Sequence, residues 1–301
     1  MNSPLVSIAI HIGKQDYYPL LENLLKSFLI CNEYPNIELI LVESGGNQPL
    51  REWLRKINFD SYFINYDNVV TTIQKKSTVN IKKKLLFLDY PDDLLWNTCY
   101  SDAVRKSIEH STGTYFTLLA EDNQFIIEGD IIKEYISILQ HIGEDTHMIY
   151  FASMQLYKYF KSNNSFDRVQ NYKGIKYFPI KNVKWCSSQF CNKKVLEKIG
   201  PLALSDEEDP HRMINYSLSR VTKLKFKRCY KAIPAAIWFH NSSNAKFIDL
   251  ILKNTRKNPD YILLNTTSLN DLNKFFDKNI DDPELRPLST EDWHDRINVE
   301  N

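Results

Sequence analysis

Glycine is scarce in this sequence, with 8 residues in 301, whereas there are 17 Tyr and 16 Phe. This composition fits a compact fold and names no function. No stretch reaches the roughly 18–20 apolar residues that a membrane-spanning helix requires. The first ten residues, MNSPLVSIAI, lack the basic start and long apolar core of a secretory signal, so we expect none.

An excess of charge is also missing, because 38 Lys and Arg residues stand against 37 Asp and Glu residues. A net charge of +1 creates no overall field toward nucleic acid or an anionic membrane, so we expect no nucleic-acid partner. The five cysteines are scattered, and Cys186 and Cys191 lack the paired spacing of a zinc site. They indicate reduced thiols in a cytoplasmic protein.

Apolar runs alternate with amphipathic stretches over the first sixty-odd residues. Residues 5–12 and 37–42 are almost continuously apolar, which is typical of strands buried on both faces. Leucines between residues 20 and 29 recur with the helical period, and residues 50–57 also favour a helix. Strand, helix, strand, helix predicts right-handed crossovers and a parallel sheet in an α/β fold.

The later chain continues this alternation. We expect helices over residues 93–109, 131–142 and 193–199, and a mobile loop over 158–175. Further strands are expected at residues 60–66, 85–88, 114–119, 147–154, 185–192, 224–229 and 235–239. The domain organisation predicted is one α/β domain over 1–245, followed by a C-terminal helical extension and polar tail over 246–301.

The most informative segment is residues 115–125, YFTLLAEDNQF, where an apolar run stops on Glu121, Asp122 and Asn123. Carboxylates at the C-terminal end of a buried strand lie where open α/β sheets bind ligands. Two acidic side chains and an amide can hold a hard divalent cation, which in turn can hold a diphosphate. A strand followed by an ordinary polar turn is the alternative, and this segment alone does not decide between them.

Three further places put polar chemistry beside an apolar run or a helix start: Glu43, His240 and the acidic cluster at 205–209 before Pro210. A nucleotide–metal site needs such groups: carboxylates for the nucleoside and the metal, a neutral imidazole as a further ligand, and a base for a hydroxyl. Each also has a structural reading, as a turn residue, a core histidine or a helix N-terminus favoured by the helix dipole.

Over roughly residues 4–242 the chain resembles the inverting glycosyltransferases of family 2, which have the GT-A fold. The resemblance rests on five segments: 4–12 (PLVSIAIHI), 34–45 (YPNIELILVESG), 103–115 (AVRKSIEHSTGTY), 116–123 (FTLLAEDN) and 186–202 (CSSQFCNKKVLEKIGPL). They are similar to the family's opening strand, the strand ending in Val-Asp-Asp-Gly-Ser, the Ala-Arg-Asn helix, the Asp-x-Asp strand end and the segment entering a Gly-Pro-Phe turn. The resemblance implies a GT-A-like Rossmann-type sandwich with a mostly parallel central sheet and flanking helices.

For the donor, the resemblance implies that Glu43 takes the place of the Asp that recognises uracil or ribose. His11 and Gly13 fall where the family has Pro-Thr-Tyr-Asn, so base recognition differs there. Arg105 replaces the Asn of the Ala-Arg-Asn helix, as a cation toward the diphosphate or as a solvent-facing arginine. Glu121 stands next to the metal motif and is a further donor-site residue.

For the metal and the base, the resemblance implies that Asp122 and His240 hold Mn²⁺ or Mg²⁺. Ala120 replaces the first Asp of the motif, which leaves Glu121 or Asn123 to help. The pair Glu208 and Asp209 resembles the Glu-Asp that supplies the catalytic base, although the following Pro-His-Arg departs from the family and leaves Glu207 open as well.

The implied activity is inverting transfer of a sugar from a nucleotide-diphosphate donor, a UDP-sugar, to a hydroxyl of a glycan or lipid-linked glycan. Bacterial surface polysaccharide synthesis, in the cytoplasm or at the inner face of the membrane with a peripheral contact, is the implied setting. The alternative is a catalytically degenerate glycosyltransferase-like binding module, which Ala120 favours. A nucleotidyltransferase would need a Gly-rich basic loop after the first strand, and Gly13-Lys14 is a poor substitute.

Overall fold

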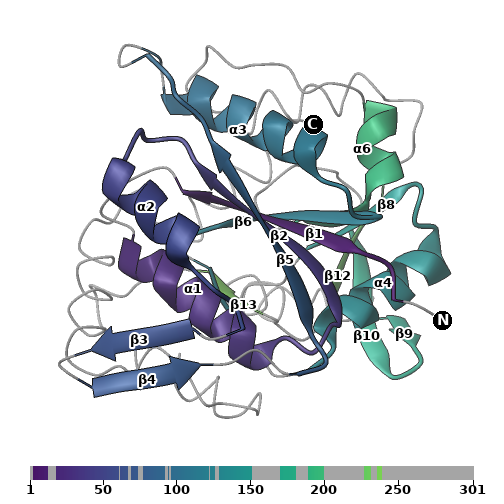
Figure 1. Cartoon of the computed structure of the whole chain (residues 1–301). Helices are drawn as coiled ribbons and strands as arrows, with labels where there is room; N and C mark the ends of the chain where they lie inside the picture. The colour runs from purple at the N-terminus through teal and green to yellow at the C-terminus, as the bar shows by residue number, and fades with distance from the viewer. Residues whose placement is uncertain are drawn as a thin grey trace, which may run out of the picture.

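The computed structural model describes residues 3–12, 18–60, 62–66, 69–73, 77–91, 94, 96–121, 123–125, 129–150, 170–180, 189–199, 227–231 and 236–238 (Figure 1). Its centre is a nine-stranded sheet in the order β5-β2-β1-β6-β11-β8-β12-β10-β9. These strands are β5 (Asn80–Phe87), β2 (Asn36–Glu43), β1 (Val6–Ile12), β6 (Tyr115–Ala120), β11 (Gln189–Asn192), β8 (His147–Tyr150), β12 (Lys227–Lys231), β10 (Ile175–Ile180) and β9 (Gln170–Tyr172).

Strand direction divides this sheet into two parts. β5, β2, β1 and β6 are parallel neighbours. β11 runs antiparallel to both β6 and β8, and β10 runs antiparallel to both β12 and β9, whereas β12 and β8 are parallel. Seven of the nine strands of this sheet therefore point the same way, which confirms the predicted α/β class with a mostly parallel sheet.

Helices cover both faces of the sheet, as the alternation of side chains along β1 requires. Ile8 and Ile10 pack in one core with α1 (Tyr18–Cys31), α2 (Gln48–Lys56) and α4 (Ile131–Ile142). Ala9 packs in a second core with α3 (Trp96–His110) and α6 (Lys193–Ile199). The result is a three-layer sandwich, with α1 and α2 on one side of the sheet and α3 and α6 on the other (Figure 1).

The segment after residue 66, where we expected a strand only at 85–88, contains more strand than that. The predicted strand at 60–66 is β3 (Tyr62–Tyr66), and it forms a separate hairpin with β4 (Val69–Ile73), which was not predicted. β5 begins at Asn80, whereas the predicted strand begins at residue 85. The prediction was too short because the three lysines at 82–84 do not fit the pattern of a buried strand. β5 is an edge strand, where lysines are tolerated and discourage pairing with other chains.

The predicted loop over 158–175 is wrong at its C-terminal end, where β9 and β10 form a hairpin. The turn between them uses Lys173 and Gly174 with φ of 50° and 82°. Positive φ at both central residues is what the tight hairpin turn requires, and glycine adopts it without strain. The described strand β12 (Lys227–Lys231) overlaps the strand predicted at 224–229, whose first three residues lie outside the described part of the chain.

The predicted C-terminal extension over 246–301 and the rest of the loop lie outside the described residues, so the domain boundaries stay predictions. Among the helices that the structure describes, none is both long and apolar enough to cross a membrane.

Candidate functional site

The chain reverses its direction across the sheet at β1. From β1 it passes to β2 and then β5, before β6 pairs with the opposite side of β1. In open α/β sheets such a reversal leaves a crevice outside the carboxyl ends of the two strands, and ligands bind there. α1 and α3, which flank this point, pack on opposite faces of the sheet. The topology thus points to the C-terminal ends of β1 and β6.

Strand register brings three of the predicted residues to that edge. Ile12 is paired with Glu43, and His11 is paired with Ala120, directly before Glu121. Glu43 is also paired with Phe87 at the end of β5. His11, Glu43 and Glu121 therefore lie at the ends of three adjacent strands, at the same edge of the sheet.

A two-stranded sheet extends this edge beyond β6. β7 (Asn123–Phe125) pairs antiparallel with β13 (Ala236–Trp238), and Trp238 lies opposite Asn123. Asn123 directly follows Asp122, and Trp238 stands two residues before His240. The pairing therefore brings together residues close in sequence to the two predicted metal ligands, Asp122 and His240.

Several predicted residues themselves lie outside the described part of the chain: Gly13, Asp122, Glu208, Asp209 and His240. Their roles stay predictions. Within the described ranges, no three His, Cys, Asp or Glu side chains gather into a group that could hold a metal ion.

The turn after β6 is held by its own polar groups. Glu121 is 8% exposed and Asn123 is buried. The Asn123 amide Nδ2 donates to the carbonyl of Ala120 at 2.8 Å, which closes the turn. Asn123 therefore has a local structural role.

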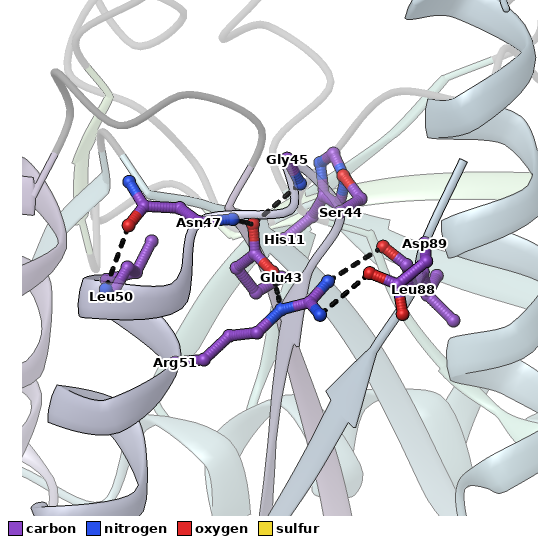
Figure 2. A network of polar contacts seen from close by, with 9 residues as sticks. All are labelled: His11, Glu43, Ser44, Gly45, Asn47, Leu50, Arg51, Leu88 and Asp89. Atoms are coloured by element: carbon purple, nitrogen blue, oxygen red, sulfur yellow. Dashed lines mark hydrogen bonds and ion pairs between the residues drawn. The ribbon is translucent and has the colours of Figure 1, made fainter. Parts of the chain in front are cut away.

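Glu43 is the centre of a buried polar network at the end of β2 (Figure 2). Its Oε1 accepts the backbone N–H groups of Gly45 at 2.6 Å and Asn47 at 3.2 Å. Its Oε2 accepts Nε–H of Arg51, from the first turns of α2. With a residue exposure of 1%, the Glu43 carboxylate fixes the loop 44–47 and the start of α2.

Arg51 carries this network from β2 to β5. Its Nη2 donates to the carbonyl oxygen of Leu88 at 3.1 Å, and its Nη1 lies 2.7 Å from Oδ1 of Asp89. The guanidinium also lies over the ring of Phe87, 5.2 Å from the ring centroid. The Leu88 N–H donates in turn to the Glu43 carbonyl at 2.9 Å. One buried arginine therefore holds the ends of two adjacent strands.

His11 lies beside this network on the α3 face of the sheet. Its Nε2 is 2.8 Å from Oγ of Ser44, and its ring meets Tyr100 edge-on with centroids 5.0 Å apart. Burial lowers the pKa of His11 from 6.5 to about 4, because the charged imidazolium loses its hydration. His11 is therefore a neutral imidazole at pH 7 that orients the first residue of the loop 44–47.

Arg105 is placed differently from the other predicted donor residues. It lies nine residues into α3, paired with Asp102 one turn earlier and 4.0 Å from Glu109 one turn later. Asp102 also accepts from the Tyr90 hydroxyl at 2.8 Å, and burial with this bond raises the pKa of Tyr90. α3 runs away from the ligand edge, so the structure does not bring Arg105 together with His11 and Glu43.

The sequence predictions missed Arg51, Ser44 and Asp89. Asp89 had a usable signal, since it follows a predicted strand in the same way that Glu43 does. Arg51 had none in the local pattern, because a cation on an amphipathic helix normally faces solvent.

No protein-family profile and no curated protein matches this chain. Solved structures similar to it include the mannosyltransferase PcManGT from Pyrobaculum calidifontis in complex with GDP-Man and Mn²⁺, at 12% identity and a TM-score of 0.46. That alignment covers 77% of this chain and 58% of the mannosyltransferase, so the chain spans less than two thirds of that protein's length.

S. aureus TarS (residues 1–349) is similar at 11% identity and a TM-score of 0.46, over 98% of this chain and 78% of TarS. Its complex with UDP gives 10% identity and a TM-score of 0.47, over 96% and 77%. Because these TM-scores are below 0.5, the likenesses carry no argument about the fold or the activity of this chain.

Proposed function

We propose that this protein transfers a sugar from a nucleotide-diphosphate donor, a UDP-sugar, to a hydroxyl of a glycan or lipid-linked glycan. The observation that supports this best is the shared edge of β2, β1 and β6. Glu43, His11 and Glu121 end adjacent strands there, and the β7–β13 pairing lies directly beyond them. A donor lying along that edge would meet a nucleoside corner at one end and a diphosphate corner at the other.

The diphosphate corner is assigned to Asp122 and His240. A carboxylate and a neutral imidazole form a donor set that suits Mn²⁺ or Mg²⁺, which agrees with the cofactor that the glycosyltransferase resemblance implies. When bound, such a cation would neutralise charge on the leaving diphosphate. Ala120 supplies no ligand, so Glu121 is the nearest further carboxylate in the sequence.

The nucleoside corner is assigned to the loop 44–47, with neutral His11 at its base and Gly13 nearby in the sequence. Glu43 fixes the backbone of this loop because its carboxylate accepts hydrogen bonds from the N–H groups of Gly45 and Asn47. Asp209, or Glu208 beside it, is assigned as the base that takes the acceptor proton in a single displacement with inversion. Arg105 is not needed in this assignment.

Two variants test the chemistry, with UDP release from a UDP-sugar as the measurement. Asp122→Asn should abolish metal-dependent turnover, whereas the matched control Asp60→Asn, at an exposed residue, should leave it unchanged. Undiminished turnover in Asp122→Asn contradicts the metal assignment. Asp209→Asn should remove transfer and spare UDP binding, and a loss of UDP binding in this variant rules out its role as the base.

A binding module without catalysis is the second candidate, and Ala120 at the end of β6 favours it. Ala120 is paired with His11 at the same edge of the sheet, so the site lacks the carboxylate that the first Asp of the family motif would supply there. A module of this kind would bind glycan or a partner protein without affinity for UDP that depends on a metal.

A further inference from the structure

Asp89 differs from the rest of the Glu43 network in its exposure. Its side chain is 77% exposed, whereas the side chains of Arg51 and Glu43 are 5% and 1% exposed. The buried Glu43 carboxylate pairs with the buried Arg51 guanidinium, which in turn pairs with the solvent-exposed carboxylate of Asp89. This difference calls for a reason, because exposed ion pairs add little to folding stability.

The ends of β2 and β5 are held together without the side chain of Asp89. The strand ends are already joined by the Leu88 N–H to the Glu43 carbonyl, by Arg51 to Glu43 and by Arg51 to the Leu88 carbonyl. None of these three bonds uses an atom of the Asp89 side chain. The contact between Arg51 Nη1 and Asp89 therefore orients an exposed acceptor more than it holds the fold.

The geometry also limits what Arg51 and Glu43 can do for a ligand. Three of the five N–H donors of the guanidinium are already engaged, by Glu43, Leu88 and Asp89, and the side chain is 5% exposed, so Arg51 offers a phosphate little access. The Glu43 carboxylate accepts three hydrogen bonds and is sealed from solvent. Asp89 is the member of this network that still presents free acceptor capacity to a ligand.

We propose that Asp89 is a donor-binding residue that accepts hydrogen bonds from the ribose hydroxyls of the nucleoside, and that Arg51 is the positioning residue that holds it. This inference rests on the proposed glycosyl transfer. A carboxylate suits neutral hydroxyl donors and repels phosphate, so its ligand is the sugar of the nucleoside rather than the diphosphate.

The spacing of the sheet agrees with this assignment. β5 and β6 are separated by three strand intervals, which correspond to about 14 Å. An extended nucleoside diphosphate has a comparable length. A donor with its diphosphate beyond β6 therefore reaches the end of β5 with its nucleoside, two residues past Phe87.

Calorimetric titration of the full chain with UDP and with 2′,3′-dideoxyuridine diphosphate, both with Mn²⁺, tests the inference. The wild type should prefer UDP by about tenfold, because two charge-assisted hydrogen bonds are lost with the hydroxyls. Asp89→Ala should weaken UDP about tenfold and bind both compounds equally. Arg51→Lys keeps the charge without the planar fork and should reduce the same preference. The exposed control Glu52→Gln should change neither affinity.

The outcomes separate the two proposals. If the wild type binds UDP but Asp89→Ala keeps the full preference over the dideoxy compound, the role of Asp89 is wrong and glycosyl transfer stands. If the wild type binds both compounds equally, the ribose contact is again excluded. If the wild type binds neither, the UDP-sugar function fails, and the assignment of Asp89 fails with it.

Discussion

His11 links the folding free energy of this protein to pH. The residue is 3% exposed, and burial lowers its pKa from 6.5 to about 4. The unfolded chain therefore binds a proton at this histidine below pH 6.5, whereas the folded protein does so only near pH 4. Because the unfolded state binds more protons in this window, stability falls as the pH is lowered through it.

The size of the effect follows from the two pKa values. Lowering the pH from 7 to 5 should cost about 2 kcal/mol of unfolding free energy through His11 alone, and full protonation about 3 kcal/mol. Glu38 and Asp102 have lowered pKa values, held down by their hydrogen-bond donors despite opposing desolvation, and contribute their own losses at lower pH. These two carboxylates therefore contribute little between pH 7 and 5, and a comparison with a variant at His11 isolates the histidine.

Urea denaturation of the wild type and of His11→Gln at pH 7, 6 and 5 measures this linkage. The variant removes the His11 ring and keeps a polar group near Ser44, and the two proteins share every other ionisable group. The wild type should lose about 2 kcal/mol more than the variant between pH 7 and 5. Parallel losses in the two proteins would show that His11 is not held neutral by burial.

Two further predictions concern packing at the edges of the sheet, and both are checked by urea denaturation. Gly113→Ala should cost about 3 kcal/mol, because its Cβ would lie 2.6 Å from Ser7 N and Oγ and 2.9 Å from the Leu5 carbonyl oxygen. Gly46→Ala has a φ of +69° but open space and should cost only about 1 kcal/mol; the reverse order would contradict the steric account. Lys83→Met should cost about 1–3 kcal/mol, because Nζ donates to the carbonyls of Leu54, Arg55 and Ile57 at 3.1, 2.9 and 2.6 Å. The exposed neighbour variant Lys82→Met should stay within about 0.5 kcal/mol of wild type, and equal losses would exclude this helix cap.

The strands that build the site were predictable from the sequence because they are buried on both faces. β1, β2 and β6 are continuous apolar runs, and their order with the helices fixed the parallel arrangement. β5 was predicted too short, since Lys82–Lys84 read as a solvated run. Lys83 reaches the carbonyls at the end of α2, a partnership 26–29 residues apart in the chain that no local pattern shows.

The same limit applied to the site. The rule that carboxylates end buried strands located Glu43 and Glu121 correctly on one edge. It did not predict that Glu43 turns inward, because its partner Arg51 lies on a helix whose buried side depends on tertiary packing. Asp89 obeys the same rule, directly after the predicted strand 85–88, but it lies outside the segments that carry the family resemblance.

The central claim is that the edge formed by β2, β1 and β6 binds a nucleoside diphosphate together with a divalent cation. The most direct test is calorimetric titration of the full chain with UDP, in Mn²⁺ and in EDTA. We expect UDP to bind in Mn²⁺ and its binding to weaken at least tenfold, by about 1.4 kcal/mol, when the metal is removed. Absence of binding in both conditions, or equal affinity in both, would contradict it.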